Sequence, residues 1–224
     1  LDLLLSIVLP SIVLMRFSDE QDLGASGALV VALAFPIGLG IYELLRYRQT
    51  NYIAVLGLVS VLLTGGIGLL QLDARWLAIK EAAIPAVLGI AVLVSARLGY
   101  PLIRVLLYNP KILDTPRISR ILRERGVEQA FELRLSNATY LLAGTFFFSA
   151  VMNYLLAAWI VTSPSGTAAF NEELGRLTLL SYPVIAIPSM LMMLGIFWFL
   201  WRSIRAYTGL ALEEILASPP TDQP

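Results

Sequence analysis

The chain has 224 residues, of which 58% are hydrophobic and only 14% charged, and its 16 basic residues balance its 16 acidic ones. Soluble domains carry about 25% charged residues, so this composition is typical of an integral membrane protein. Cysteine and histidine are absent from the sequence, which excludes disulfides, thiolate chemistry, the commonest metal ligands and the usual proton shuttle. No nucleophile–base pair is visible, so we expect a non-enzymatic protein with no cofactor and no nucleic-acid partner.

Six segments are candidates for membrane spans. The uncharged runs 23–42, 49–72, 135–171 and 177–201 each reach roughly the 20 residues that a helix needs to cross about 30 Å of hydrocarbon. The shorter run 82–96 becomes a span if its helix begins near Trp76. We interpret residues 1–16 as a first span whose front is missing, because the chain begins at Leu1 without a methionine; the alternative is a signal-peptide core, although no small-residue cleavage site follows. The sequence therefore predicts an all-α, polytopic six-helix membrane domain over residues 1–208, with spans at 1–16, 23–42, 52–72, 76–96, 137–161 and 177–201.

The basic residues favour one side of the membrane. Twelve of the sixteen lie in the alternate loops 43–51 and 97–136 and in the tail after residue 201. Because basic residues concentrate in cytoplasmic loops, we expect these segments and both termini to lie in the cytoplasm.

The expected cytoplasmic loop 97–136 contains a predicted amphipathic helix, "DTPRISRILRERG" (114–126). Asp114 or Thr115 is its expected cap, Pro116 lies in its first turn, and Gly126 is its expected end. The helix either lies on the anionic cytoplasmic leaflet, binds a partner, or simply links spans four and five. We expect residues 209–224 to form a short amphipathic stretch followed by disorder. The candidate lipid-surface side chains, which border the apolar face of Ile118, Ile121 and Leu122, are Arg117, Arg120 and Arg123.

Proline and glycine recur in the expected spans. Each even-numbered span has a proline before a Gly-Ile pair, as in "FPIGLGI" (35–41), which suggests three similar kinked hairpins but also fits chance. In span three, Thr64 borders the glycine-rich stretch "LLTGGIGLL" (62–70), which indicates either close helix packing or an unwound point that lines a cavity. Asn153 is the other deep polar residue, and we expect it to form an interhelical hydrogen bond.

Two adjacent charges, Lys80 and Glu81, lie about one turn inside the fourth expected span. Neighbouring helical residues point about 100° apart, so we expect that these two do not pair with each other. Charges inside a membrane cost about 2.5–3.5 kcal/mol and usually indicate pairing or function. Candidate partners are Glu172, Glu173 and Arg176, from "FNEELGRLT" (170–178). The five residues predict either a Lys80–Glu173 or Glu81–Arg176 bridge, or a polar vestibule that takes an ion or a headgroup.

The stretch "VLLTGGIGLLQLDARWLAIKEAAIPAVLGIAVLVSARLGYPLIRVLLYN" resembles the central part of the intracellular septation protein A (YciB-type) inner-membrane family. Shared features are the glycine pair, a short outer loop, a lysine opening the next span, a Leu-Val-Ser ending and "PLIR". With "NYLLAAW" and the Phe-Asn…Leu-Thr stretch before span six, the resemblance covers roughly residues 50–200. A branch of six-span septation-like or transporter-like bacterial proteins, which carries "FNEELGR" nearly verbatim, is more similar still.

The resemblance implies a bacterial inner-membrane protein linked to envelope maintenance and cell division. It does not imply a defined chemical reaction. Lys80 matches the family pattern, whereas Glu81 and the Glu172–Glu173 pair do not. Two functions therefore stay open. A scaffold, binding other membrane proteins or itself, predicts glycine-filled, closed packing and an exposed apolar stripe or basic helix. A small transporter, channel or lipid-handling protein predicts a polar cavity among spans three, four and six.

Overall fold

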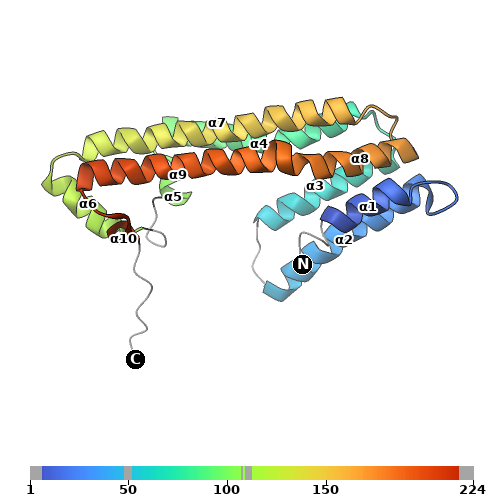
Figure 1. Ribbon diagram of the computed structural model, residues 1–224, viewed down its shortest axis with the longest axis horizontal. Coiled ribbons are helices and arrows are strands. Elements are labelled where there is room, and N and C mark those ends of the chain that lie inside the picture. The colour runs from blue at the N-terminus through green and yellow to red at the C-terminus, as the bar shows by residue number, and fades with distance from the viewer. Residues whose placement is uncertain (1–6, 48–51, 107, 109–112, 217–224) are drawn as a thin grey trace. The chain divides into compact units, whose positions relative to one another are not determined.

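Helices form the regular structure of the residues that the computed structural model describes, which are 7–47, 52–106, 108 and 113–216 (Figure 1). Within this part of the chain the exception is an isolated antiparallel bridge between Leu113 and Leu216. The elements, in chain order, are α1 (Leu9–Arg16), α2 (Gly24–Tyr47), α3 (Tyr52–Leu69), α4 (Arg75–Arg97), α5 (Leu102–Leu106), α6 (Thr115–Glu124), α7 (Glu128–Ile160), α8 (Ala168–Ser181), the π-helical turn η2 (Tyr182–Ala186), α9 (Ile187–Thr208) and α10 (Leu212–Ile215).

Among the described residues, four helices are long and apolar enough to cross a membrane, which agrees with the predicted class of an all-α membrane protein. They are Gly24–Tyr42 within α2, all of α4, all of α7, and the continuous helix Ala168–Thr208 formed by α8, η2 and α9. A shorter apolar helix covers Val59–Leu69 in α3. Of the first expected span, α1 contributes 8 helical residues, and residues 1–6 lie outside the described part of the chain.

The helix α7 begins at Glu128, well before the expected start of span five at residue 137. Its 33 residues extend about 50 Å, more than the roughly 30 Å of a bilayer's hydrocarbon. Its first turns carry Glu128, Glu132 and Arg134, side chains that suit water or headgroups. The last part of the expected loop 97–136 is therefore helical, because the charged first turns of α7 continue without a break into the expected span.

The chain divides into two compact units, each with its own apolar core. Unit 1 comprises Leu1–Ile84 and Ala150–Ile187, and unit 2 comprises Pro85–Ser149 and Pro188–Pro224. Two of the boundaries fall at prolines, Pro85 in α4 and Pro188 in α9. A proline removes a backbone donor from a helix, and just before Pro188 the Ile187 N–H bonds to the carbonyl of Tyr182 in the wider π-helical pattern.

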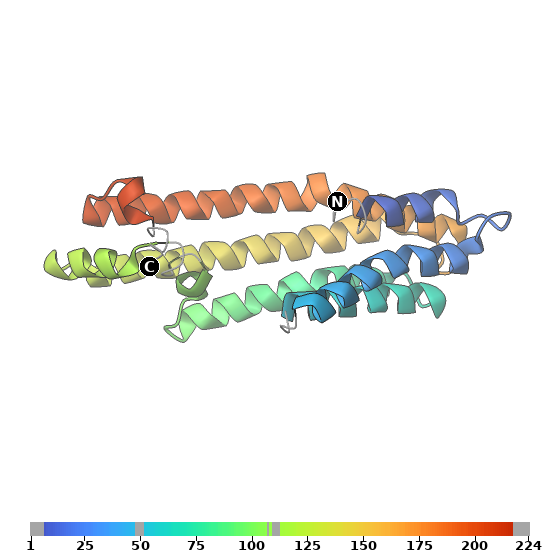
Figure 2. The same ribbon diagram turned by 90° about the horizontal axis from the view of Figure 1, so that it is seen from below.

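Unit 1 packs through glycines. Within it, α1 contacts α2 and α8, and α2 contacts α3 (Figure 2). A Cβ on Gly65 would lie 2.6 Å from Leu33 Cδ1, and one on Gly68 would lie 2.4 Å from Leu29 Cδ2. Gly65 and Gly68 therefore allow close helix packing, which is the first of the two interpretations of the glycine-rich stretch.

The helix α6 belongs to unit 2 and begins and ends as predicted. Asp114 Oδ1 accepts a hydrogen bond from the Arg117 N–H at 3.1 Å, and Gly126 ends the helix with a φ of +64°. However, Ile118 and Leu122 are fully buried in the core of unit 2. The apolar face that was a candidate to enter the membrane surface is thus covered by the chain itself.

The segment 209–216, part of which was expected to form a short amphipathic stretch, also folds into unit 2. Leu210 and Ile215 are buried, and the Asp114 N–H donates to the Ile215 carbonyl at 2.8 Å. Glu214 accepts hydrogen bonds from Arg117 at 2.8 Å and from the Ala211 N–H at 3.0 Å, and these donors lower the pKa of its carboxyl. Figure 1 shows α10 next to α6. Residues 217–224 lie outside the described part of the chain.

Replacing Gly175 by alanine tests the contact between α1 and α8. The new Cβ would lie 2.9 Å from the Ser11 carbonyl oxygen and 2.8 Å from Met15 Cγ, so α1 has to move. We expect Gly175→Ala to lower the free energy of unfolding by about 1–3 kcal/mol, measured by titration with a denaturing detergent and circular dichroism. Gly144→Ala is the matched control, because nothing lies within 4 Å of its Cβ position; equal effects of the two changes would contradict this packing.

Candidate functional site

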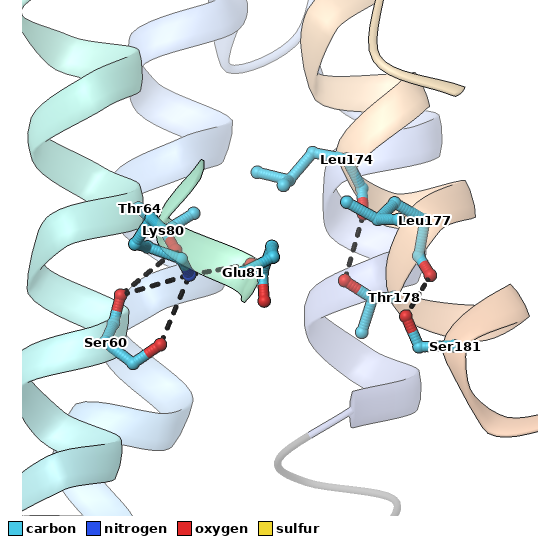
Figure 3. Close-up of polar contacts among 8 residues, drawn as sticks. All are labelled: Ser60, Thr64, Lys80, Glu81, Leu174, Leu177, Thr178 and Ser181. Carbon is cyan, nitrogen blue, oxygen red and sulfur yellow. Dashed lines mark hydrogen bonds and ion pairs between the residues drawn. The ribbon is translucent and has the colours of Figure 1, made fainter. Parts of the chain in front are cut away.

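Lys80 is a buried charged residue of unit 1, with only 9% of its side chain exposed. Its Nζ lies 2.6 Å from Glu81 Oε1, and it donates hydrogen bonds to Thr64 Oγ1 at 2.7 Å and to Ser60 Oγ at 3.2 Å (Figure 3). The Ser60 carbonyl oxygen lies at 3.5 Å. We call these four residues the Lys80 cluster.

The prediction that Lys80 and Glu81 do not pair with each other is wrong. The 100° offset between neighbours in a helix describes the directions of their Cα–Cβ bonds. A lysine and a glutamate have four and two methylene groups beyond Cα, so their charged ends bend toward each other from different faces. Because the pair has no net charge, α4 carries both residues at a lower cost than two separate ions.

The ammonium group of Lys80 has no donor to spare for a ligand. An ammonium group has three N–H donors, and the Lys80 cluster offers it a carboxylate oxygen and two hydroxyl oxygens. The Thr64 hydroxyl in turn donates to the Ser60 carbonyl at 3.1 Å, which leaves its oxygen free to accept from Lys80. The geometry is that of a satisfied structural cation and not that of an open anion site.

Glu81 is the more open member of the pair, with 28% of its side chain exposed. In the view of Figure 3 it lies on the side of the Lys80 cluster that faces α8, where Thr178 and Ser181 lie. Both hydroxyls donate to carbonyls of their own helix, Thr178 to Leu174 at 2.9 Å and Ser181 to Leu177 at 2.8 Å. The oxygens of Glu81, Thr178 and Ser181 on this side can therefore accept a hydrogen bond or contact a cation.

The other three residues of the predicted vestibule form separate local contacts. Arg176 pairs with Glu172 at 2.7 Å, one turn away on α8, with both side chains about half exposed. Glu173 accepts hydrogen bonds from the N–H groups of Thr162 and Ser163, both at 2.9 Å. Glu173 therefore ties α8 to the end of α7, and the predicted Lys80–Glu173 and Glu81–Arg176 bridges are replaced by these contacts.

Two polar residues important to unit 1 were missed by the sequence analysis. Ser60 lies four residues before Thr64, a spacing that puts both hydroxyls on one face of α3. This spacing is the sequence feature that indicates a polar pair at this place. Asn171 is fully buried and its Nδ2 donates to Ser18 Oγ at 3.0 Å and to the Ala25 carbonyl at 2.7 Å, so it joins α8 to the α1–α2 loop and the start of α2. The predicted interhelical bond of the half-buried Asn153 stays a prediction.

The three arginines of α6 are divided among different surroundings. Arg117 pairs with Glu214 at 2.8 Å, and Arg123 Nε lies 3.8 Å from Glu128 Oε1. Arg120 is exposed. Because the apolar face of α6 is buried and two of its cations face carboxylates of the chain, the helix is poorly suited to insert into a leaflet.

Comparisons with known proteins do not assign the chain to a family. No family model, no curated protein and no solved structure matches it. Within the described part of the chain, no group of three or more metal-ligating side chains lies together. The resemblance to septation protein A therefore rests on the residues quoted above and stays a prediction.

A double-mutant cycle measures how far Lys80 and Glu81 depend on each other. Lys80→Met leaves Glu81 without its counter-ion, so we expect it to lower the free energy of unfolding by about 1–3 kcal/mol. Adding Glu81→Gln removes the stranded charge and should recover roughly half of that loss. Unfolding of the four proteins by denaturing detergent gives the coupling energy; additive effects would show that the pair does not stabilise unit 1.

Proposed function

We propose that the chain is a non-enzymatic scaffold of the bacterial inner membrane that binds other membrane proteins or a second copy of itself. In this proposal it crosses the membrane six times, as three hairpins, with both termini in the cytoplasm. The observation that carries the proposal is the satisfied state of Lys80, whose donors are all engaged within unit 1. A buried cation without a free donor stabilises helix packing, and it does not supply a binding site for a transported anion.

Two further features support a scaffold. At Gly65 and Gly68, side chains of α2 lie so close to α3 that a Cβ would clash with them, as closed packing requires. In unit 2, α5, α6, the start of α7, the end of α9 and α10 share one apolar core. A folded, charged end of this kind offers a rigid surface to partners in the cytoplasm.

The cellular role is proposed from the resemblance. The quoted stretch from Val61 to Asn109 is similar to septation protein A, which favours a part in envelope maintenance and cell division. Basic residues concentrate in the cytoplasmic loops of inner-membrane proteins, so the arginine-rich alternate loops support a cytoplasmic position for both termini.

A transporter is the second candidate, and Glu81 is the observation that favours it. Its partly exposed carboxylate and the hydroxyl oxygens of Thr178 and Ser181 offer acceptors to a proton or a cation. In a transporter of this kind Glu81, and not Lys80, would carry the function.

The proposed topology can be tested in a natural cysteine-free background. Glu20, in the α1–α2 loop, and Arg120, on α6, are both exposed. We expect a membrane-impermeant maleimide to label Glu20→Cys in intact spheroplasts and Arg120→Cys only after permeabilisation. Labelling of Arg120→Cys in intact spheroplasts would overturn the orientation.

Complementation separates the scaffold from the transporter. In a strain that lacks the protein and shows an envelope or division defect, the double variant Lys80→Met/Glu81→Gln should restore growth if the chain is a scaffold. Arg120→Glu, which alters the exposed surface of α6, should fail to restore it, while Glu20→Arg on the opposite side serves as its control. Loss of function in the double variant, together with cation or proton flux in proteoliposomes of the wild type, would favour the transporter.

A further inference from the structure

A basic and aromatic pocket lies on unit 2 between the start of α7 and the end of α9. Its volume is about 280 Å³, and Arg134, Trp198, Phe199, Arg202 and Tyr207 are among its lining residues. The Tyr207 side of the pocket is fixed in place. Its carbonyl accepts a hydrogen bond from Arg125 at 3.2 Å, and its ring packs against Phe131 with the ring centres 6.3 Å apart.

Within the described part of the chain, no carboxylate forms a salt bridge with the arginines of this pocket. Arg134 and Arg202 are both exposed, and neither forms a salt bridge with a carboxylate of the described residues. The lining contains no acidic residue. Elsewhere in the described part of the chain, the arginines that do form salt bridges are Arg75, Arg104, Arg117, Arg123 and Arg176.

The pocket lies at the depth expected for lipid headgroups. The spans predicted from the sequence begin at residue 137 in α7 and end at residue 201 in α9, next to Arg134 and Arg202 respectively. The guanidinium of Arg202 lies over the ring of Trp198, 5.5 Å from its centre, and Arg205 lies over Trp201 at 5.9 Å. Tryptophan rings with arginines just beyond them are typical of a membrane–water interface.

An apolar face of α9 leads from the membrane interior to this pocket. Leu191, Leu194 and Trp198 are each more than half exposed. Their spacing of three and four residues places them on one face of the helix, and Arg202 follows four residues after Trp198 on the same face. A lipid whose acyl chain lies along these side chains would bring its headgroup to the arginines.

We propose that this pocket binds an anionic phospholipid, with Arg134 and Arg202 donating hydrogen bonds to its phosphate and the apolar face of α9 contacting an acyl chain. Guanidinium groups bind phosphate oxygens through paired, charge-assisted hydrogen bonds, and basic pockets between membrane helices suit anionic headgroups. This site replaces α6 as the place of lipid recognition. It requires α7 and α9 to cross the membrane but does not depend on the proposed scaffold role.

The test measures phosphatidylglycerol bound to the purified full chain by native mass spectrometry. We expect Arg134→Gln/Arg202→Gln to weaken binding by about tenfold or more. Arg16→Gln/Arg120→Gln is the matched control, since it removes two other exposed arginines and should leave binding within about twofold of the wild type. Phosphatidylcholine should bind the wild type and both variants alike. Equal losses in the pocket variant and the control would overturn the proposal, because they would indicate non-specific attraction.

Two further arms complete the experiment. Arg134→Lys/Arg202→Lys keeps the charge but loses the paired geometry, so its binding should fall between that of the wild type and that of the glutamine variant. Circular dichroism of the lysine variant checks that its helices are intact. Inorganic phosphate added at millimolar concentration should not displace phosphatidylglycerol, and displacement would show a free-phosphate site and overturn the lipid assignment.

Discussion

A membrane interior offers no water, so every charged or polar side chain within the helices has to find its partners in the protein. Lys80 shows what this constraint demands of unit 1. Its ammonium takes a carboxylate from its own helix and hydroxyl oxygens from α3, so that α3 and α4 are joined at this depth. Asn171 joins α8 to the segment between α1 and α2 in the same way. Interhelical contacts in unit 1 therefore combine hydrogen bonds between side chains with close glycine packing.

The two units achieve close packing by different means. In unit 1, glycines allow the helices to approach: Gly68 faces Leu29, and Gly175 lies against the backbone of α1. In unit 2, large side chains fill the space, and the rings of Tyr108 and Phe131 pack at a tilt of 58° with their centres 5.4 Å apart. Burial also raises the pKa of the Tyr108 hydroxyl, as expected for a phenol within such a core.

Lipid recognition illustrates why charge alone does not define a surface. The α6 helix has the sequence of a membrane-surface helix, yet its apolar residues Ile118 and Leu122 are buried and Arg117 faces Glu214. The pocket of unit 2 has only the two arginines Arg134 and Arg202, but neither forms a salt bridge with a described carboxylate, and exposed apolar side chains of α9 lie nearby. The available surface, and not the number of arginines, therefore determines which region suits an anionic headgroup.

The sequence by itself determined the class of the protein, the positions of most helices and the ends of α6. These properties are local: apolar runs of sufficient length form membrane helices, Asp114 caps the helix that follows it, and Gly126 adopts the positive φ that ends it. The position of Lys80 within an apolar run also indicated a buried charge that needs a partner. The partners predicted from the sequence were wrong, because Lys80 pairs with Glu81.

Only the tertiary structure decided what the buried and basic residues contact. The pairing of Lys80 with Glu81 depends on flexible side chains, and its bonds to Ser60 and Thr64 depend on how α3 lies against α4. Ile118 is buried in a core that also contains Ile215 of α10, almost a hundred residues further along the chain. Contacts between distant segments do not follow from local patterns, because many pairings satisfy the same periodicity and only the packed fold selects one.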